Sequence, residues 1–65
     1  MAENRLTMAE RHVRQGRVAV ARQRDIVARK KKLGLELEQS EALLRNFETS
    51  LAIFEDDLRI TRTGM

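Results

Sequence analysis

Apolar residues recur at every seventh position in this 65-residue chain, in two runs separated by Gly34. The first run consists of Leu6, Val13, Val20 and Val27, accompanied by Ala19, Ile26 and Leu33. The second run consists of Leu37, Leu44, Leu51 and Leu58, with Phe47 and Phe54 three residues after their leucine neighbours. A seven-residue repeat places apolar side chains along one stripe of a helix. The sequence therefore predicts two amphipathic helices, one on each side of Gly34.

The residues at the ends of the first run predict where the first helix begins and ends. Thr7 and Glu10 match a capping box, in which the threonine side chain and the glutamate satisfy free backbone N–H groups. Gly34 suits the left-handed conformation that commonly ends a helix. The first helix is therefore expected over about residues 7–33, with the turn at Gly34.

The second helix is expected over about residues 36–61. Acidic residues in its first turns favour the positive end of the helix dipole. Because Ser40 is an alternative cap, the start is left open between Glu36 and Glu41. The whole chain, residues 1–65, is expected to be a single all-α domain, since its length is near the lower limit for independent folding.

Two helices joined by a short connection run antiparallel, so the numbers of facing residues should sum to about 71. The expected pairs are Val27 with Leu44, Val20 with Leu51, Val13 with Leu58, Gly16 with Phe54, and Gln23 with Phe47. Small residues would then face large ones, as close packing requires. This packing explains why a glycine stands inside a helix, where it costs about 1 kcal/mol. The alternative is that Gly16 only weakens or bends the first helix.

The apolar stripes are wider than the seam between two helices requires. Ile26, Leu43, Ile53 and Ile60 would be exposed in a monomer, and contiguous exposed apolar patches normally mark an interface. We therefore expect a two-helix hairpin that dimerises into a four-helix bundle, or that docks on a helical segment of another protein. The residues expected at the interface or in the core are Val13, Val20, Val27, Leu44, Phe47, Leu51, Phe54 and Leu58.

Charge is distributed unevenly along the chain. Residues 1–33 carry ten Lys and Arg residues and three Asp and Glu residues, a net charge of +7, whereas residues 34–65 carry three and seven, a net charge of −4. The alternative functional hypothesis is therefore a dimer that binds nucleic acid with the basic face of the first helix. Its contacts would be Arg11, Arg14, Arg17, Arg22, Arg24, Lys30, Lys31 and Lys32. Against it, no aromatic side chains are placed to stack on bases.

The sequence offers little for catalysis. His12 is the only side chain that ordinarily titrates near neutrality, and Asp57 lies near it in the expected register. The acidic triplet Glu55, Asp56 and Asp57 cannot converge on one metal ion, because consecutive helix residues point in different directions. We therefore expect no enzyme, no cofactor, no metal site and no small-molecule substrate.

Location is predicted from what the sequence lacks. It contains no cysteine, no apolar segment of a signal peptide and no apolar run near the roughly 18 residues that a membrane span needs. The first helix is basic and amphipathic, but its apolar face lacks the large side chains that anchor a helix at a membrane surface. A soluble cytoplasmic protein without membrane contact is expected.

Several short strings resemble a group of proteins known from alphaproteobacteria, the rhizobial type especially. These strings are Ala9-Glu10-Arg11-His12-Val13, Arg22-Gln23-Arg24 followed by Ile26-Val27, Gly34, and Leu43-Leu44 with Phe47-Glu48 and Ser50-Leu51. The relatives are short uncharacterised helical proteins of unknown function, and the resemblance covers about residues 8–54. They usually carry His-Asp-Thr after the glycine, where this chain has Leu35-Glu36-Leu37. The resemblance implies two helices and a bacterial cytoplasmic protein, and it implies no activity.

Overall fold

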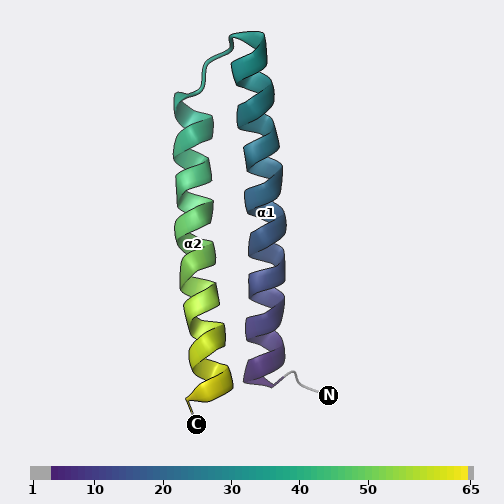
Figure 1. Ribbon diagram of the computed structural model, residues 1–65, viewed down its shortest axis with the longest axis vertical. Helices are drawn as coiled ribbons and strands as arrows, with labels where there is room; N and C mark the ends of the chain where they lie inside the picture. Colours follow the sequence, from purple (N-terminus) through teal and green to yellow (C-terminus); the bar gives the residue numbers. More distant parts are fainter. Residues whose placement is uncertain (1–3, 65) are drawn as a thin grey trace.

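The computed structural model describes residues 4–64, which form two long helices joined by a short turn (Figure 1). Helix α1 spans Arg5–Leu33 and helix α2 spans Glu38–Thr63. The helices run antiparallel and lie side by side along most of their length, with α1 reaching beyond α2 at the turn and with the start of α1 and the end of α2 at the opposite end. The described residues contain no strand. The prediction of an all-α, two-helix hairpin is confirmed.

Helix α1 begins earlier than the expected position near residue 7. Asn4 is its N-cap, and the Asn4 side-chain oxygen accepts a hydrogen bond from the backbone N–H of Thr7 at 2.8 Å. Asparagine is among the best N-cap residues, so it competes successfully with the threonine three positions later. The expected capping box does not form, because Thr7 lies inside the helix and the carboxylate of Glu10 bonds to Arg62.

Replacing Asn4 with alanine is expected to lower the free energy of unfolding by about 1 kcal/mol, because one backbone N–H loses its partner. Thr7→Ala is the matched control, and we expect a smaller loss from it, since its hydroxyl does not cap the helix. Urea unfolding followed by circular dichroism measures both. A larger loss in Thr7→Ala than in Asn4→Ala would contradict the observed cap.

The turn closes helix α1 with paired backbone hydrogen bonds. Gly34 has φ 71° and ψ 26°, in the left-handed region where glycine carries no steric penalty. Its N–H donates to the carbonyl of Lys31 at 3.2 Å, and the N–H of Leu35 donates to the carbonyl of Lys30 at 2.9 Å. This pair of bonds is a Schellman motif, which satisfies carbonyls that the helix end would otherwise leave free.

Helix α2 starts within the range that the sequence left open, but Ser40 is not its cap. The residue before the helix, Leu37, makes no side-chain cap, and a carboxylate oxygen of Glu36 accepts from the backbone N–H of Glu38 at 2.6 Å. Ser40 is buried, and it accepts two hydrogen bonds from helix α1. Gln23 donates its side-chain amide to the Ser40 carbonyl at 2.8 Å, and Lys30 donates to the Ser40 hydroxyl at 2.7 Å. Ser40 therefore ties the turn end of the two helices together.

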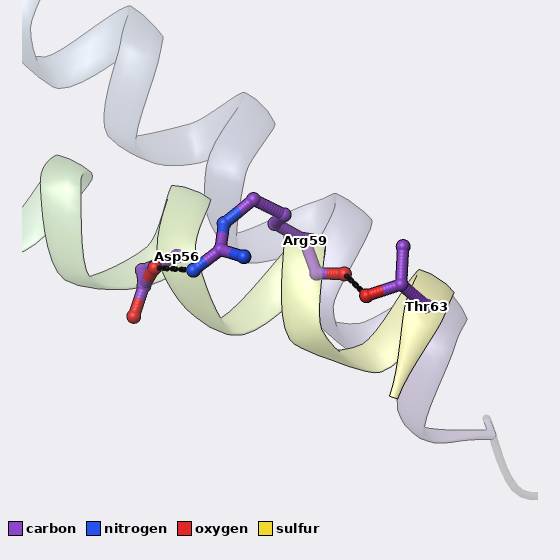
Figure 2. Close-up of polar contacts among 3 residues, drawn as sticks. All are labelled: Asp56, Arg59 and Thr63. Atoms are coloured by element: carbon purple, nitrogen blue, oxygen red, sulfur yellow. Dashed lines mark hydrogen bonds and ion pairs between the residues drawn. The ribbon is translucent and has the colours of Figure 1, made fainter. Parts of the chain in front are cut away.

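The last turns of helix α2 are stabilised by local contacts, and the helix continues to Thr63 rather than ending near residue 61. Figure 2 shows the guanidinium of Arg59 paired with the carboxylate of Asp56, three residues earlier. The hydroxyl of Thr63 donates to the backbone carbonyl of Arg59 at 2.9 Å. Side chains three and four residues apart on a helix are neighbours, so both contacts form within the helix itself.

The core is a narrow seam between the helices. Its buried apolar residues are Ala9, Val13, Val20, Val27 and Leu58. Leu51 and Phe54 are half-buried and pack against the cluster of Ala9, Val13 and Leu58. Leu44 and Phe47 are also half-buried. All eight residues expected at the interface or in the core are thus at least half-buried in the hairpin itself.

Gly16 lies in the seam, against Leu51 and Phe54 of α2. A Cβ atom at this position would lie 3.1 Å from Cδ1 of Leu51 and 3.6 Å from Cδ2 of Phe54. The absence of a side chain at Gly16 therefore makes room for two large residues, which favours the packing interpretation over simple weakening of the helix. Gln23 is buried in the seam, and its side-chain amide donates to the Ser40 carbonyl near the turn, while its expected pairing with Phe47 stays a prediction. A buried amide needs such a partner.

Candidate association face

One side of the hairpin is lined by regularly spaced ion pairs between the helices. Arg24 pairs with Glu48 at 3.1 Å, Arg17 with Glu55 at 3.4 Å, and Arg62 with Glu10 at 3.5 Å. We call this side the ion-pair flank. Each pair is largely exposed, so it contributes about 0–1 kcal/mol at most. The pairs nevertheless line this side of the seam with charge, around a hollow of about 450 Å³ that mixes charged side chains with Val13, Val18 and Leu58.

The opposite side of the seam is a shallow apolar groove of about 310 Å³. Its lining residues are His12, Gln15, Gly16, Ala19, Phe47, Ser50 and Phe54. The groove exists because helix α1 contributes small residues here, glycine and alanine, while helix α2 contributes two phenylalanines. The phenylalanine rings are only half-buried, so part of their apolar surface faces solvent.

The apolar surface continues beyond the groove toward the turn. Ile26 lies seven residues after Ala19, and Leu43 lies seven residues before Ser50. Residues at this spacing lie on the same side of a packed helix pair. Both side chains are exposed, Ile26 at 41% and Leu43 at 42%. We call the groove together with these two residues the groove face.

At the end of the hairpin opposite the turn, which we call the open end, the groove face ends in two charged side chains. Arg5 lies seven residues before His12, and Asp57 lies seven residues after Ser50. Their side chains pair at 3.3 Å. The groove face is therefore apolar toward the turn, and at its other end it carries one ion pair beside the exposed side chains of Leu6 and Ile60.

The sequence suggested that Asp57 lies near His12. The two side chains do not pair, because the carboxylate of Asp57 bonds to Arg5 instead. The imidazole of His12 packs on Phe54, with ring centroids 5.1 Å apart and an angle of 35° between the ring planes. A half-buried imidazole gains packing energy from such an aromatic contact. Among residues 4–64, no three His, Cys, Asp or Glu side chains are grouped closely enough to hold a metal ion.

The structure divides the candidate nucleic-acid contacts into two sets. Arg17 and Arg24 pair with carboxylates of α2, and Lys30 bonds to Ser40. The remaining members are exposed on helix α1 and are Arg11, Arg14, Arg22, Lys31 and Lys32. Arg17 and Arg24 thus also contribute to the contact between the helices, although their side chains remain 66% and 64% exposed.

The difference between the two flanks of the seam was not predicted from the sequence. The signal was present, because Glu10, Arg17 and Arg24 follow one another at intervals of seven, as do Glu48, Glu55 and Arg62. Charged residues at such positions beside an apolar seam commonly form ion pairs between helices.

Comparisons of the chain with protein-family models, with curated proteins and with solved structures gave no match. The similarity to alphaproteobacterial proteins therefore stays a prediction. Neither helix, within residues 4–64, combines the length and the apolar character that crossing a membrane requires.

Proposed function

We propose that this protein is a non-catalytic interaction module that self-associates through the groove face, so that two hairpins form a four-helix bundle. The observation that carries the proposal is the asymmetry of the hairpin, in which one flank is lined by ion pairs and the other is an open apolar groove. The proposed role requires no cofactor and no substrate. It keeps the cytoplasmic location expected of the cysteine-free sequence and the bacterial source that the resemblance implies.

The first support is the small size of the core. Five apolar residues are buried, and no side chain in residues 4–64 is less than 2% exposed. The large apolar side chains that remain exposed are Leu6, Met8, Val18, Ile26, Leu33, Leu35, Leu43, Ile53 and Ile60. Ordering a chain costs about 1.5 kcal/mol per residue, and two helices without a disulfide or a metal rarely bury enough apolar area to offset it. Of these side chains, Ile26 and Leu43 lie on the groove face, where a second layer of helices would add to the burial.

The second support, which favours another copy of this chain as the partner, is charge complementarity. Helix α1 carries ten Lys and Arg residues and two Asp and Glu residues, a net charge of +8. Helix α2 carries three and six, a net charge of −3. Each hairpin thus carries one basic helix and one acidic helix. In a dimer, the basic helix of each copy can lie against the acidic helix of the other, so that two such contacts form together. Such matching surfaces favour correct pairing more than they add affinity.

Thermal unfolding over a range of protein concentrations tests the proposal. If folding and association are coupled, the midpoint temperature Tm rises as the protein concentration rises from about 1 to 100 μM, by mass action. Circular dichroism at 222 nm follows the loss of helix. A Tm that is the same at all concentrations, with the protein at monomer mass, would refute self-association.

Nucleic-acid binding is the second candidate, and the exposed cations of helix α1 favour it. Arg14, Arg22 and Arg29 form no ion pair within residues 4–64, and all three are exposed. Aligned cations of this kind attract a phosphate backbone, with an affinity that falls as salt rises.

The double variant Arg14→Glu, Arg22→Glu is expected to abolish salt-sensitive binding to mixed duplex RNA or DNA while leaving the fold intact. The matched control is Arg45→Glu, Arg59→Glu, which changes the net charge equally but on helix α2. Fluorescence anisotropy at 20 mM salt measures both, with about tenfold weaker binding or more expected from the first variant alone. Equal losses from both variants, or no binding by the unmodified protein, would exclude this candidate.

A further inference from the structure

We infer that the two hairpins associate with their turns at the same end of the bundle, so that helix α1 of each copy lies against helix α2 of the other. This inference rests on the proposed self-association through the groove face. Two symmetric face-to-face arrangements exist for such hairpins. In the same-end arrangement the two-fold axis runs parallel to the helices. In the opposite-end arrangement the axis runs across them, and each helix lies against its own copy.

The shapes of the two helices favour the same-end arrangement. Along the groove, helix α1 presents the small residues Gly16 and Ala19, whereas helix α2 presents Phe54 next to Gly16, and Phe47 seven residues earlier and so nearer the turn. The same-end arrangement places Phe54 of one copy over the small residues of the other, which fills space efficiently. The opposite-end arrangement places phenylalanine against phenylalanine and glycine against alanine, so that one side is overfilled and the other contains voids. Protein interiors tolerate neither.

The distribution of charge along the groove face gives a second, independent reason. Ile26 and Leu43 lie toward the turn, and the ion pair of Arg5 with Asp57 lies at the open end. In the same-end arrangement, apolar side chains meet apolar side chains, and the ion pairs of the two copies lie together at the exposed end. In the opposite-end arrangement, each ion pair would be buried beneath isoleucine and leucine. Burying an ion pair among apolar side chains carries a desolvation penalty that the attraction often fails to offset.

The net charges of the helices also favour the same-end arrangement. In the same-end arrangement each basic helix α1 has an acidic helix α2 as its neighbour both within its own hairpin and across the interface. The opposite-end arrangement places two basic helices side by side. Like charges facing each other disfavour that arrangement.

Distance measurement between two spin labels distinguishes the arrangements. The chain has no cysteine, so Leu35→Cys, in the exposed turn, carries a single nitroxide per copy. The hairpin is 49 Å long. We expect label-to-label distances of about 15–30 Å by double electron–electron resonance, because neighbouring helices pack about 8–10 Å apart and the labels add their own length. Thr63→Cys, at the open end, should give a similarly short distance.

Each outcome of this experiment decides something different. Short distances at both positions support the same-end arrangement. Distances near the full length of the hairpin at both positions, in samples of dimer mass, would overturn the arrangement and leave self-association intact. No dipolar coupling in samples of monomer mass would overturn both the arrangement and the proposed function. Circular dichroism of each labelled variant confirms that the helices are retained before the distances are interpreted.

Discussion

Replacing Leu51 with aspartate is expected to unfold the hairpin. Leu51 is half-buried in the seam, where its Cδ1 lies 3.1 Å from the position that a Cβ of Gly16 would occupy. The substitution removes apolar contacts and places a carboxylate in the apolar seam. Losing the leucine alone costs about 2–5 kcal/mol, and the charge in the apolar seam adds to this. A chain of this size has little more stability than that in total.

The measurement is far-UV circular dichroism during urea unfolding. Thr49→Asp is the matched control, because Thr49 is an exposed residue of the same helix and receives the same charge. We expect Thr49→Asp to unfold cooperatively, close to the unmodified protein, and Leu51→Asp to lack a helical baseline. A helical Leu51→Asp variant with the same unfolding midpoint as Thr49→Asp would contradict the helix–helix seam described here.

Replacing Ile26 with glutamate is expected to prevent association. Ile26 is 41% exposed on the groove face of a single hairpin, so a monomer can solvate the new carboxylate. In the proposed bundle the same side chain is covered by the second copy. A two-fold interface contains every substitution twice, so each association event would bury two charges. A dissociation constant at least about 100-fold higher is expected, which corresponds to about 1.4 kcal/mol for each copy.

The matched control for this prediction is Val18→Glu. Val18 is a β-branched residue of the same helix with a similar exposure, 47%, and it lies beside Arg17 and Leu58 on the ion-pair flank. The proposal predicts that Val18→Glu associates as the unmodified protein does. Analytical ultracentrifugation over a dilution series measures both dissociation constants. Equal weakening by the two substitutions would show that general charge or stability, rather than the groove face, governs association.

The parts of the fold that follow a period were predictable from the sequence. Spacing by seven identified both helices and placed Val13 and Leu58 in one cluster, because the geometry of a packed helix pair depends mainly on where apolar residues recur. Gly34 was predictable for a different reason, since few other residues adopt a left-handed conformation without strain.

The helix starts were less predictable because several residues compete for one role. Asn4 and Thr7 are both good caps, and the capping free energies of asparagine and threonine are too similar to choose between them from the sequence. Ser40 was a plausible cap for helix α2, yet its position above Gln23 and Lys30 makes it a link between the helices instead. Such a choice depends on contacts between residues far apart in the chain.

The candidate site was predictable only in part. The sequence identified Phe47, Phe54 and the exposed isoleucines as candidates, but it did not separate the two flanks of the seam. The length of the arginine side chains made the pairs on each flank harder to predict. The expected register placed Asp57 beside His12, yet the side chain of Arg5 reaches Asp57. A flexible arginine side chain can reach across more than one helical turn, so its partner depends on local packing as well as on register.

Self-association of the hairpin is measured directly by the molar mass of the unmodified protein in solution. Light scattering across a dilution series gives this mass. The chain has a mass of 7.5 kDa. With circular dichroism recorded on the same samples, we predict a helical species of about twice that mass at micromolar concentration, with helix content falling as the dimer dissociates on dilution. A helical species that keeps the monomer mass at every concentration would contradict self-association, because two helices alone would then be sufficient for folding.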